Sequence, residues 1–318
     1  MTLPPPDERP VVLVAVTTFR RTELLPTLVA AIRAGAGEAG ERMRIALVDN
    51  DPQRSAAECA EVLGVGYVSE TTPGIAAARQ AALDAARAGE LVAMVDDDVV
   101  PRPGWLDALV DVWRAEQPAV VMGYVEYIWP EGTDPWIVAG GFMRRRRRTT
   151  GEPLDALATG NVLIDPAQVR SLGVTFDSGL GLAGGEDMLF GRSVRAAGGR
   201  ILASADSVVR DDVPVARTTR EFVRRRTISQ GQMRTRLLTR TASTPRRVVL
   251  RGAHLAGGIA RLGVFTARRQ LAALRHDVAA HAVLQRRAWF AQGRILGAIG
   301  HVTPEYARPA APASSASG

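Results

Sequence analysis

The sequence predicts an α/β fold, with a mostly parallel sheet flanked by helices and a basic α-helical extension behind it. Apolar runs that suit buried strands alternate with helical patterns from residue 10 to residue 116. Polar residues follow the apolar runs where strands should end. The charge also changes along the chain: residues 1–214 carry 21 Arg against 30 Asp and Glu, and residues 215–300 carry 18 Arg against Glu221 and Asp277. This division predicts two parts with different tasks.

Four strand–helix units account for the first part. The strands are β-branched or apolar runs, as in parallel sheets covered on both faces, and the helices have apolar residues at helical spacing. Right-handed crossovers join such units into a parallel sheet. We expect strands at residues 10–19, 44–50, 65–70 and 91–98, and helices at residues 22–35, 56–64, 72–89 and 104–116.

The pattern loosens between about residues 119 and 158, where we expect a strand and a mobile connection. Regularity returns with "ATGNVLID", with a segment that contains a helix from Met188 to about Ala197, and with "RILASADSVVRDDVP". The ends, 1–9 and 302–318, are expected to be disordered. The predicted domains are therefore residues 10–214, which form the α/β part, and residues 215–301, which form the helical extension.

Composition excludes several classes of protein. All 40 basic residues are arginine, so a P-loop with its lysine, a Schiff-base enzyme and a kinase of the usual type are excluded. A single cysteine, Cys59, excludes an internal disulfide framework and fits a reducing cytoplasm. The polar, proline-rich start has no apolar segment of the kind found in signal peptides.

Polar residues stand at the ends of three predicted strands: Thr17–Thr18, Asp49–Asn50 and Asp96–Asp97–Asp98. Ligands of open α/β sheets bind beyond the carboxyl ends of the strands, so all three clusters should line one edge. No Gly-x-Gly-x-x-Gly follows the first strand. The acidic residues therefore indicate a site for a metal ion or a nucleotide hydroxyl.

Two acidic clusters could carry chemistry. The aspartates 96–98 could hold a divalent cation that shares a diphosphate, although helix capping or a solvated loop would also explain them. Glu186–Asp187 follow a glycine-rich stretch and begin a helix, where acidic residues are favoured by the helix dipole alone. A carboxylate at this place could instead take a proton from an acceptor hydroxyl.

Seven segments in order carry a resemblance: "VAVTTFRR", "ALVDND", "ETTPGIAAARQAAL", "VAMVDDDVVPRPGWL", "TGNVLI", "FDSGLGLAGGEDMLFGRSVRAAGG" and "ADSVVRDDVP". They resemble the family-two glycosyltransferases of GT-A (Rossmann-like) fold, and most of all the succinoglycan or exopolysaccharide glucosyltransferase group, over roughly residues 10–235. The resemblance implies an inverting, hexosyltransferase-type enzyme. It would move a sugar from a nucleoside-diphosphate sugar, with UDP expected, to a saccharide or lipid-linked acceptor, helped by Mg²⁺ or Mn²⁺.

The resemblance also implies roles for individual residues. The donor nucleotide sugar would contact Thr17, Phe19, Asp49, Arg79, Asp96 and Asp97. Asp98 would bind the metal, and Asp211 would stand in for a histidine that many relatives carry after the catalytic helix. Asp187 would be the general base, with Glu186 beside it. Gly160 and Asn161 would help shape the acceptor site.

Two further features leave alternatives open. Trp136 could form a platform on which a sugar stacks, or could simply pack within its loop. The arginines 144–148 fit either a solvated loop or a grip on an anionic acceptor.

The extension should consist of several basic helices. Residues 248–267 contain Arg251 and Arg261, and two charged side chains within a bilayer are costly, so we do not expect a membrane-spanning helix there. A helix lying on an anionic membrane surface fits better, and a packed appendage or an oligomer contact are the alternatives. We expect a cytoplasmic protein that is peripheral at the inner face of the plasma membrane.

Two other functions would use parts of the same sequence. A nucleotidyltransferase that makes an activated sugar would need a glycine-rich first loop, and "TTFRRTELLP" is poor in glycine. A nucleic-acid binder would draw on the arginine-rich segment, but no nucleic-acid module accompanies it, so no nucleic-acid partner is expected.

Overall fold

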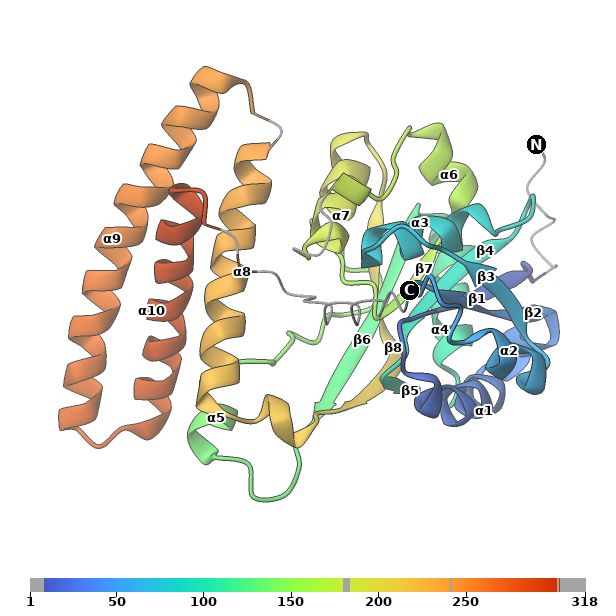
Figure 1. Ribbon diagram of the computed structural model, residues 1–318, viewed down its shortest axis with the longest axis horizontal. Helices are drawn as coiled ribbons and strands as arrows, with labels where there is room; N and C mark the ends of the chain where they lie inside the picture. The colour runs from blue at the N-terminus through green and yellow to red at the C-terminus, as the bar shows by residue number, and fades with distance from the viewer. Residues whose placement is uncertain (1–8, 180–183, 241, 302, 304–318) are drawn as a thin grey trace, which may run out of the picture.

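In the part of the chain that the computed structural model describes, residues 9–179, 184–240, 242–301 and 303, eight strands form one mixed sheet (Figure 1). Its order is β3-β2-β1-β4-β7-β6-β8-β5. The strands are β1 (Val12–Thr18), β2 (Met43–Asp49), β3 (Gly66–Ser69), β4 (Leu91–Asp96), β5 (Val99–Pro101), β6 (Val120–Ile128), β7 (Asn161–Ile164) and β8 (Ile201–Asp212).

The sheet confirms the predicted fold class. Strands β1 to β4 are mutually parallel, as the strand–helix units require. Strand β7 runs antiparallel to both β4 and β6, and β8 is parallel to β6. The short strand β5, which the sequence did not reveal, pairs antiparallel with β8.

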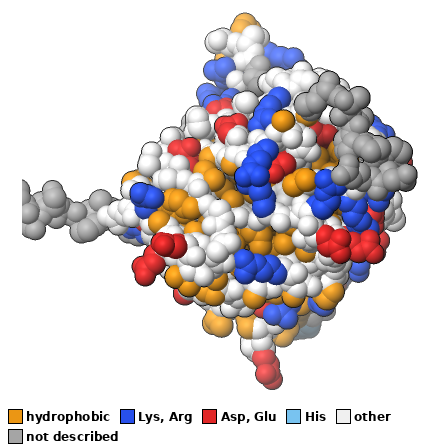
Figure 2. All heavy atoms as spheres, turned by 90° about the vertical axis from the view of Figure 1, so that its right-hand side faces the viewer, with side chains coloured by type: hydrophobic (Ala, Val, Ile, Leu, Met, Phe, Trp, Pro, Cys, Tyr) orange, Lys and Arg blue, Asp and Glu red, His pale blue; other side chains and the backbone are white. Residues whose placement is uncertain are grey.

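Helices cover both faces of the sheet. One face packs against α1 (Leu25–Gly35), α2 (Ala57–Leu63) and α4 (Trp105–Glu116), and the other against α3 (Ile75–Asp84), α6 (Pro166–Ser171) and α7 (Glu186–Ala196). Short 3₁₀ segments lie at η1 (Thr22–Leu24), η2 (Gly37–Arg42) and η4 (Val215–Arg217). At the end of the molecule formed by α1, α2 and the nearby strands, acidic and basic side chains are interspersed with apolar ones (Figure 2).

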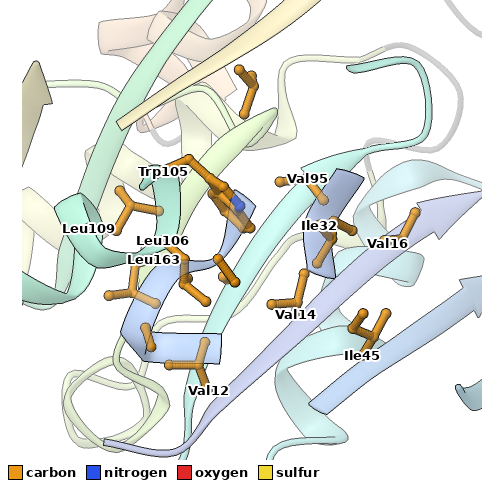
Figure 3. Packing of buried hydrophobic residues seen from close by; sticks show 14 of the residues in the cluster. Val12, Val14, Val16, Ile32, Ile45, Val95, Trp105, Leu106, Leu109 and Leu163 are labelled. Carbon is orange, nitrogen blue, oxygen red and sulfur yellow. The ribbon is translucent and has the colours of Figure 1, made fainter. Parts of the chain in front are cut away.

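Strand β1 shows why its sequence is continuously apolar. Val12, Val14 and Val16 enter the core under α1 and α4, while Leu13 and Ala15 enter the core on the opposite face. All seven residues of β1 are buried, because the strand has no solvent side. Figure 3 shows the first of these cores, in which side chains of β1 and β4 meet those of α1 and α4.

The extension consists of α8 (Arg220–Arg240), α9 (Thr244–Leu274) and α10 (Val278–Ala298), which stand side by side next to the sheet domain (Figure 1). Helices α8 and α10 approach each other through glycines. A Cβ on Gly231 would overlap the carbonyl oxygen of Phe290, and a Cβ on Gly293 would overlap that of Ile228. Small residues therefore let the two backbones pack closely.

Disorder was predicted for the two ends, residues 1–9 and 302–318. Of these residues, the structure describes Arg9 and Thr303, and the others lie outside the described part. Arg9 pairs with Asp107 at 2.9 Å, and the backbone N–H of Thr303 donates to Gln232 at 3.1 Å.

Candidate active site at the carboxyl edge of the sheet

The register of the central strands brings the predicted polar clusters to one edge. Thr17 lies beside Asp96 in the β1–β4 pair, and Thr18 lies beside Asp49 in the β1–β2 pair. Because these strands are parallel, their carboxyl ends meet there. The sequence-based expectation of a shared edge is confirmed.

Asp97 is the buried member of the aspartate triplet. It accepts hydrogen bonds from Thr18 Oγ1 at 2.9 Å and from Arg21 Nη1 at 2.8 Å. Burial raises the pKa of Asp97 to about 6, although the Arg21 charge and the two hydrogen bonds act in the opposite direction. Asp97 thus anchors the turn after β4 to the end of β1.

Asp98 faces two arginines that are far apart in the sequence. Its Oδ2 accepts from Arg21 Nη1 at 3.3 Å and from Arg217 Nη2 at 3.2 Å. Arg21 follows β1, while Arg217 ends η4, directly after β8. The Asp98 side chain keeps 23% of its surface exposed, so it remains accessible from solvent.

Asp211 lies next to this turn because β5 and β8 pair Val99 with Asp211. The side chain is buried, and within the described residues its Oδ1 has no hydrogen-bond partner. Burial is the main cause that raises the pKa of Asp211 to about 6, and repulsion by Asp98 and Asp96 adds to it. Arg217 and Arg145 only partly offset these effects.

This donor set fits a divalent cation that is shared with a substrate. Among the described residues, no three His, Cys, Asp or Glu side chains are grouped so as to hold a metal ion. Mg²⁺, however, is usually bound by one or two carboxylates together with substrate phosphates. Asp98 and the orphaned oxygen of Asp211 supply that number of ligands, and a cation would relieve the repulsion between them.

Arg79 joins the strand edge to the acidic helix. Its Nη2 donates to Asp96 Oδ1 at 3.3 Å, and its Nη1 makes an ion pair with Glu186. Arg79 and Glu186 are both buried, while Asp96 is partly exposed. One guanidinium on α3 therefore brings the end of β4 and the first turn of α7 together.

Asp187 follows Glu186 in the first turn of α7 and is partly exposed. The helix begins after Gly185, which has a φ of +84°. A Cβ at this position would also overlap the sulfur of Met233 in α8. Part of the preceding glycine-rich stretch, residues 180–183, lies outside the described residues.

Asp49 is fully buried and shapes the loop after β2. Its carboxylate accepts from the backbone N–H of Asp51 at 3.0 Å, from the N–H of Ala56 at 2.8 Å and from the Tyr67 hydroxyl at 3.1 Å. Its predicted contact with a nucleotide base stays a prediction. Phe19 is partly exposed at the end of β1, with the Arg20 guanidinium 5.1 Å from its ring centre.

Gly160 and Asn161 have different surroundings. A Cβ on Gly160 would lie 2.8 Å from Asp96 Oδ2, so this glycine leaves room for the carboxylate. Asn161 is buried, and its Nδ2 donates to the carbonyl oxygens of Tyr124 and Ser207. Asn161 thus links β7 to β6 and β8, and its predicted part in shaping the acceptor site stays a prediction.

Trp136 lies away from this edge, in α5 (Pro135–Gly140). It is buried among Phe142 and Trp289, and its Nε1 donates to His281 Nδ1 at 2.9 Å. The Arg220 guanidinium lies 4.7 Å from its ring centre. The sugar platform, one of the two alternatives for Trp136, does not fit this position. The ring packs between the sheet domain and the extension, so its faces are not open to a sugar.

Sequence reasoning missed Arg21 and Arg217. The rule that strand ends carry the site could have found Arg21, which stands three residues after β1 ends. Nothing local marks Arg217 among the many arginines of its region, because its partner Asp98 is 119 residues away.

Comparisons with known proteins place these features in a family. The model of "Glycosyl transferase family 2" matches residues 13–166. The succinoglycan biosynthesis protein ExoM of Rhizobium meliloti (strain 1021) is 30% identical over 243 residues, which cover 74% of this chain and 78% of that protein.

Two solved structures share the fold. The structure of S. aureus TarS 1-349 has a TM-score of 0.52 at 14% identity and covers 86% of this chain and 90% of its own. The structure of GalNAc-T7 with UDP, GalNAc and Mn²⁺ has a TM-score of 0.54 at 17% identity. That match covers 74% of this chain and 52% of GalNAc-T7, so the chain spans about half of that structure.

Proposed function

The chain belongs to glycosyltransferase family 2 and is a glycosyltransferase of GT-A fold, and we propose that it is an inverting enzyme that uses a UDP-sugar. The acceptor would be a hydroxyl group of a saccharide or of a lipid-linked saccharide in polysaccharide biosynthesis. The name of the Rhizobium relative supports the pathway class, and UDP in the GalNAc-T7 structure supports the nucleotide.

The observation that carries the proposal is the bridge made by Arg79. It pairs with Asp96 on the donor side and with Glu186 on α7. A donor held at Asp96 would therefore lie close to the carboxylate of the next residue, Asp187. Transfer needs this closeness, because the acceptor must approach the anomeric carbon opposite the leaving group.

The donor would be held by residues from several strand ends. Thr17, Phe19 and Asp49 are proposed on the base side, and Arg79 and Asp96 on the side of the ribose and sugar. Asp97, which is buried against Thr18 and Arg21, would act by fixing the turn between Asp96 and Asp98.

Asp98 and Asp211 would hold Mg²⁺ or Mn²⁺. The bound ion would neutralise negative charge on the departing diphosphate. Arg21 and Arg217 already face Asp98 and add positive charge at the same place. Leaving-group stabilisation would therefore come from one end of the site and proton removal from the other.

Asp187 is proposed to accept the proton of the attacking hydroxyl. The acceptor oxygen then bonds to the anomeric carbon while the bond from that carbon to the diphosphate oxygen breaks. A single displacement inverts the configuration. Glu186 is committed to Arg79 in the interior, so we assign it to positioning and assign the base role to its more exposed neighbour.

The predicted division of the chain supports a location for the reaction. We propose that residues 10–214 form the catalytic domain and that the basic residues 215–301 keep it at the inner face of the plasma membrane. The positive charge of this extension suits an anionic lipid surface.

The test is nucleoside-diphosphate release from a panel of nucleotide sugars, with and without Mn²⁺ or Mg²⁺. We expect Asp187→Asn to lower transfer by about 100- to 10,000-fold, which is the usual contribution of a general base. Asp98→Asn should lower transfer and weaken its dependence on the metal.

The matched control is Asp155→Asn, because the Asp155 side chain is fully exposed and, among the described residues, lies 3.9 Å from Arg195. Full activity in Asp187→Asn, with circular dichroism unchanged, would remove the base assignment. Pyrophosphate formed from a nucleoside triphosphate and a sugar phosphate would instead indicate a nucleotidyltransferase.

A further inference from the structure

The outward side of α9 is an exposed apolar surface. Thirteen large apolar side chains are exposed in the described part of the chain, and six of them lie on this one helix: Val248, Val249, Ile259, Val264, Leu271 and Leu274. Figure 1 places α9 at the outer edge of the molecule, farther from the sheet than α8 and α10. Its outward side is therefore free of the rest of the described protein.

Helical geometry gathers these residues into one strip. At about 100° per residue, the six side chains fall on the half of α9 that faces away from its buried residues, His254, Gly258 and Ala272. Most gaps between them are filled by small exposed residues: Gly252, Ala253, Ala256, Ala260, Gly263 and Ala267. We call these twelve residues the apolar strip. None of them is charged, and the exposed, uncharged Gln270 lies among them.

Arginines border the apolar strip. Arg261, Arg268 and Arg275 stand at intervals of seven residues along one border, and all three are exposed. Arg251 stands on the other border and is also exposed. Helix α9 contains six arginines and no acidic residue. An apolar face between rows of cations is typical of a helix that lies within an anionic membrane interface.

Length alone would also permit a different arrangement. Among the described helices, α9 is the one that is long and apolar enough, by composition, to cross a membrane. The packing of α9 against α10 does not fit a membrane-spanning α9. Gly258 lies against Ile295 of α10, and His254 Nδ1 accepts from Arg294 Nη2 at 3.1 Å. A spanning α9 would either leave α10 or take the α10 arginines into hydrocarbon, in addition to Arg251 and Arg261.

We propose that the apolar strip of α9 lies in the plane of an anionic lipid bilayer, with its bordering arginines on the lipid headgroups. The partner is the bilayer surface, since the strip supplies apolar area and the borders supply positive charge along the whole helix. The proposal deepens the membrane location proposed above and does not depend on the chemistry proposed for the active site.

The experiment is flotation of the full chain with vesicles of phosphatidylcholine alone or of phosphatidylcholine and phosphatidylglycerol. We expect binding to the anionic vesicles only. Replacing Ile259 and Val264 together by Glu should weaken binding at least tenfold. Replacing Arg261, Arg268 and Arg275 by Gln should weaken it by about fivefold for each arginine, from about 1 kcal/mol per cation near the surface.

The control is Val62→Glu, which adds one negative charge at a still more exposed apolar position on α2 and should leave vesicle binding unchanged. Sugar transfer to a soluble acceptor should be unchanged in every α9 variant. This readout separates failure of the membrane proposal from failure of the proposed catalytic function.

Three results would overturn the proposal. The first is unchanged vesicle binding in the Ile259 and Val264 double variant. The second is bound protein that alkaline carbonate does not release, because that result indicates a spanning helix. The third is a wild-type protein that forms a dimer and does not float, while the same double variant is a monomer. That result would make the strip a contact between copies of the chain.

Discussion

The sheet domain and the helical extension are built on different packing principles. In the sheet domain, large side chains such as Trp105, Leu106 and Leu109 fill two continuous cores on either side of the strands. In the extension, the buried positions of α10 are alanines and glycines. Helix α9 buries only His254, Gly258 and Ala272 among its described residues.

This difference shows two ways to exclude water. The sheet domain removes much apolar area per residue, which stabilises it through the hydrophobic effect. The extension brings helix backbones close together, which gains dispersion contacts but buries less apolar area. The extension should therefore be the less stable region, and its larger apolar residues remain available for another surface.

The largest expected effect is in the sheet domain. Trp105 is fully buried between α4 and the strands, so Trp105→Ala should lower the free energy of unfolding by about 3–5 kcal/mol. Urea denaturation measures this loss. Val62→Ala, at a position that is 79% exposed, should change it by less than about 0.5 kcal/mol. Similar values for both variants would mean that burial does not distinguish the core.

A smaller effect tests the close approach of helices in the extension. Gly293→Ala should destabilise α8 and α10 by about 1–3 kcal/mol, because the new Cβ overlaps the backbone of Ile228. Gly252→Ala is the matched control, since open space surrounds Gly252, and it should stabilise α9 by up to about 1 kcal/mol.

Hydrogen exchange resolved by segment distinguishes the two glycine variants. Exchange should rise in α8 and α10 of Gly293→Ala and stay unchanged in β1 and β4. A uniform rise over the whole chain would show that the extension and the sheet domain unfold as one unit.

The smallest effect concerns pH. Burial is the main cause that lowers the pKa of His254, and the nearby Arg294, Arg234 and Arg261 lower it further. Since the unfolded chain takes up this proton near pH 6.5 and the folded chain does so only at lower pH, the stability of the extension should fall as pH drops below about 6.5. Above that value the histidine has no effect.

All four histidines of the chain lie beyond residue 215, so the part of the pH dependence that comes from His254 should be found in the extension. Asp97 and Asp211, whose pKa values are raised to about 6, act on the sheet domain with the opposite sign, so the comparison with His254→Gln isolates the histidine. Thermal unfolding above and below pH 6.5, in the wild type and in His254→Gln, measures it. A steeper loss of stability in the variant than in the wild type would contradict the assignment to His254.

The sequence predicted the sheet where local pattern and burial agree. Runs such as "PVVLVAVTTF" are buried on both sides, so their composition alone identifies strands. Strand β5 escaped prediction because it has three residues, ends in proline and exists only through its pairing with β8. The first turn of α7 contains Glu186 and Asp187, as expected, and Gly185 provides its left-handed start.

For the candidate site, the sequence predicted the acidic residues better than their partners. Aspartates at strand ends follow from the topology of a parallel sheet, and the register of β1, β2 and β4 brings Asp49 and Asp96 to one edge. The partners Arg21 and Arg217 depend on how distant segments meet. The two alternatives for Trp136 could not be separated from the sequence for the same reason, since its partners His281 and Trp289 lie about 150 residues further on.

The connection between β8 and α8 has little freedom in its length. Its residue Arg217 reaches back to Asp98 at 3.2 Å, and α8 begins three residues later with Arg220, which pairs with Asp134. Removing one residue here would either break one of these pairs or turn α8 by about 100° about its axis. An insertion or deletion between Asp212 and Arg220 would thus disturb the acidic edge of the sheet and the direction in which α9 faces, so this short loop sets the orientation of one region against the other.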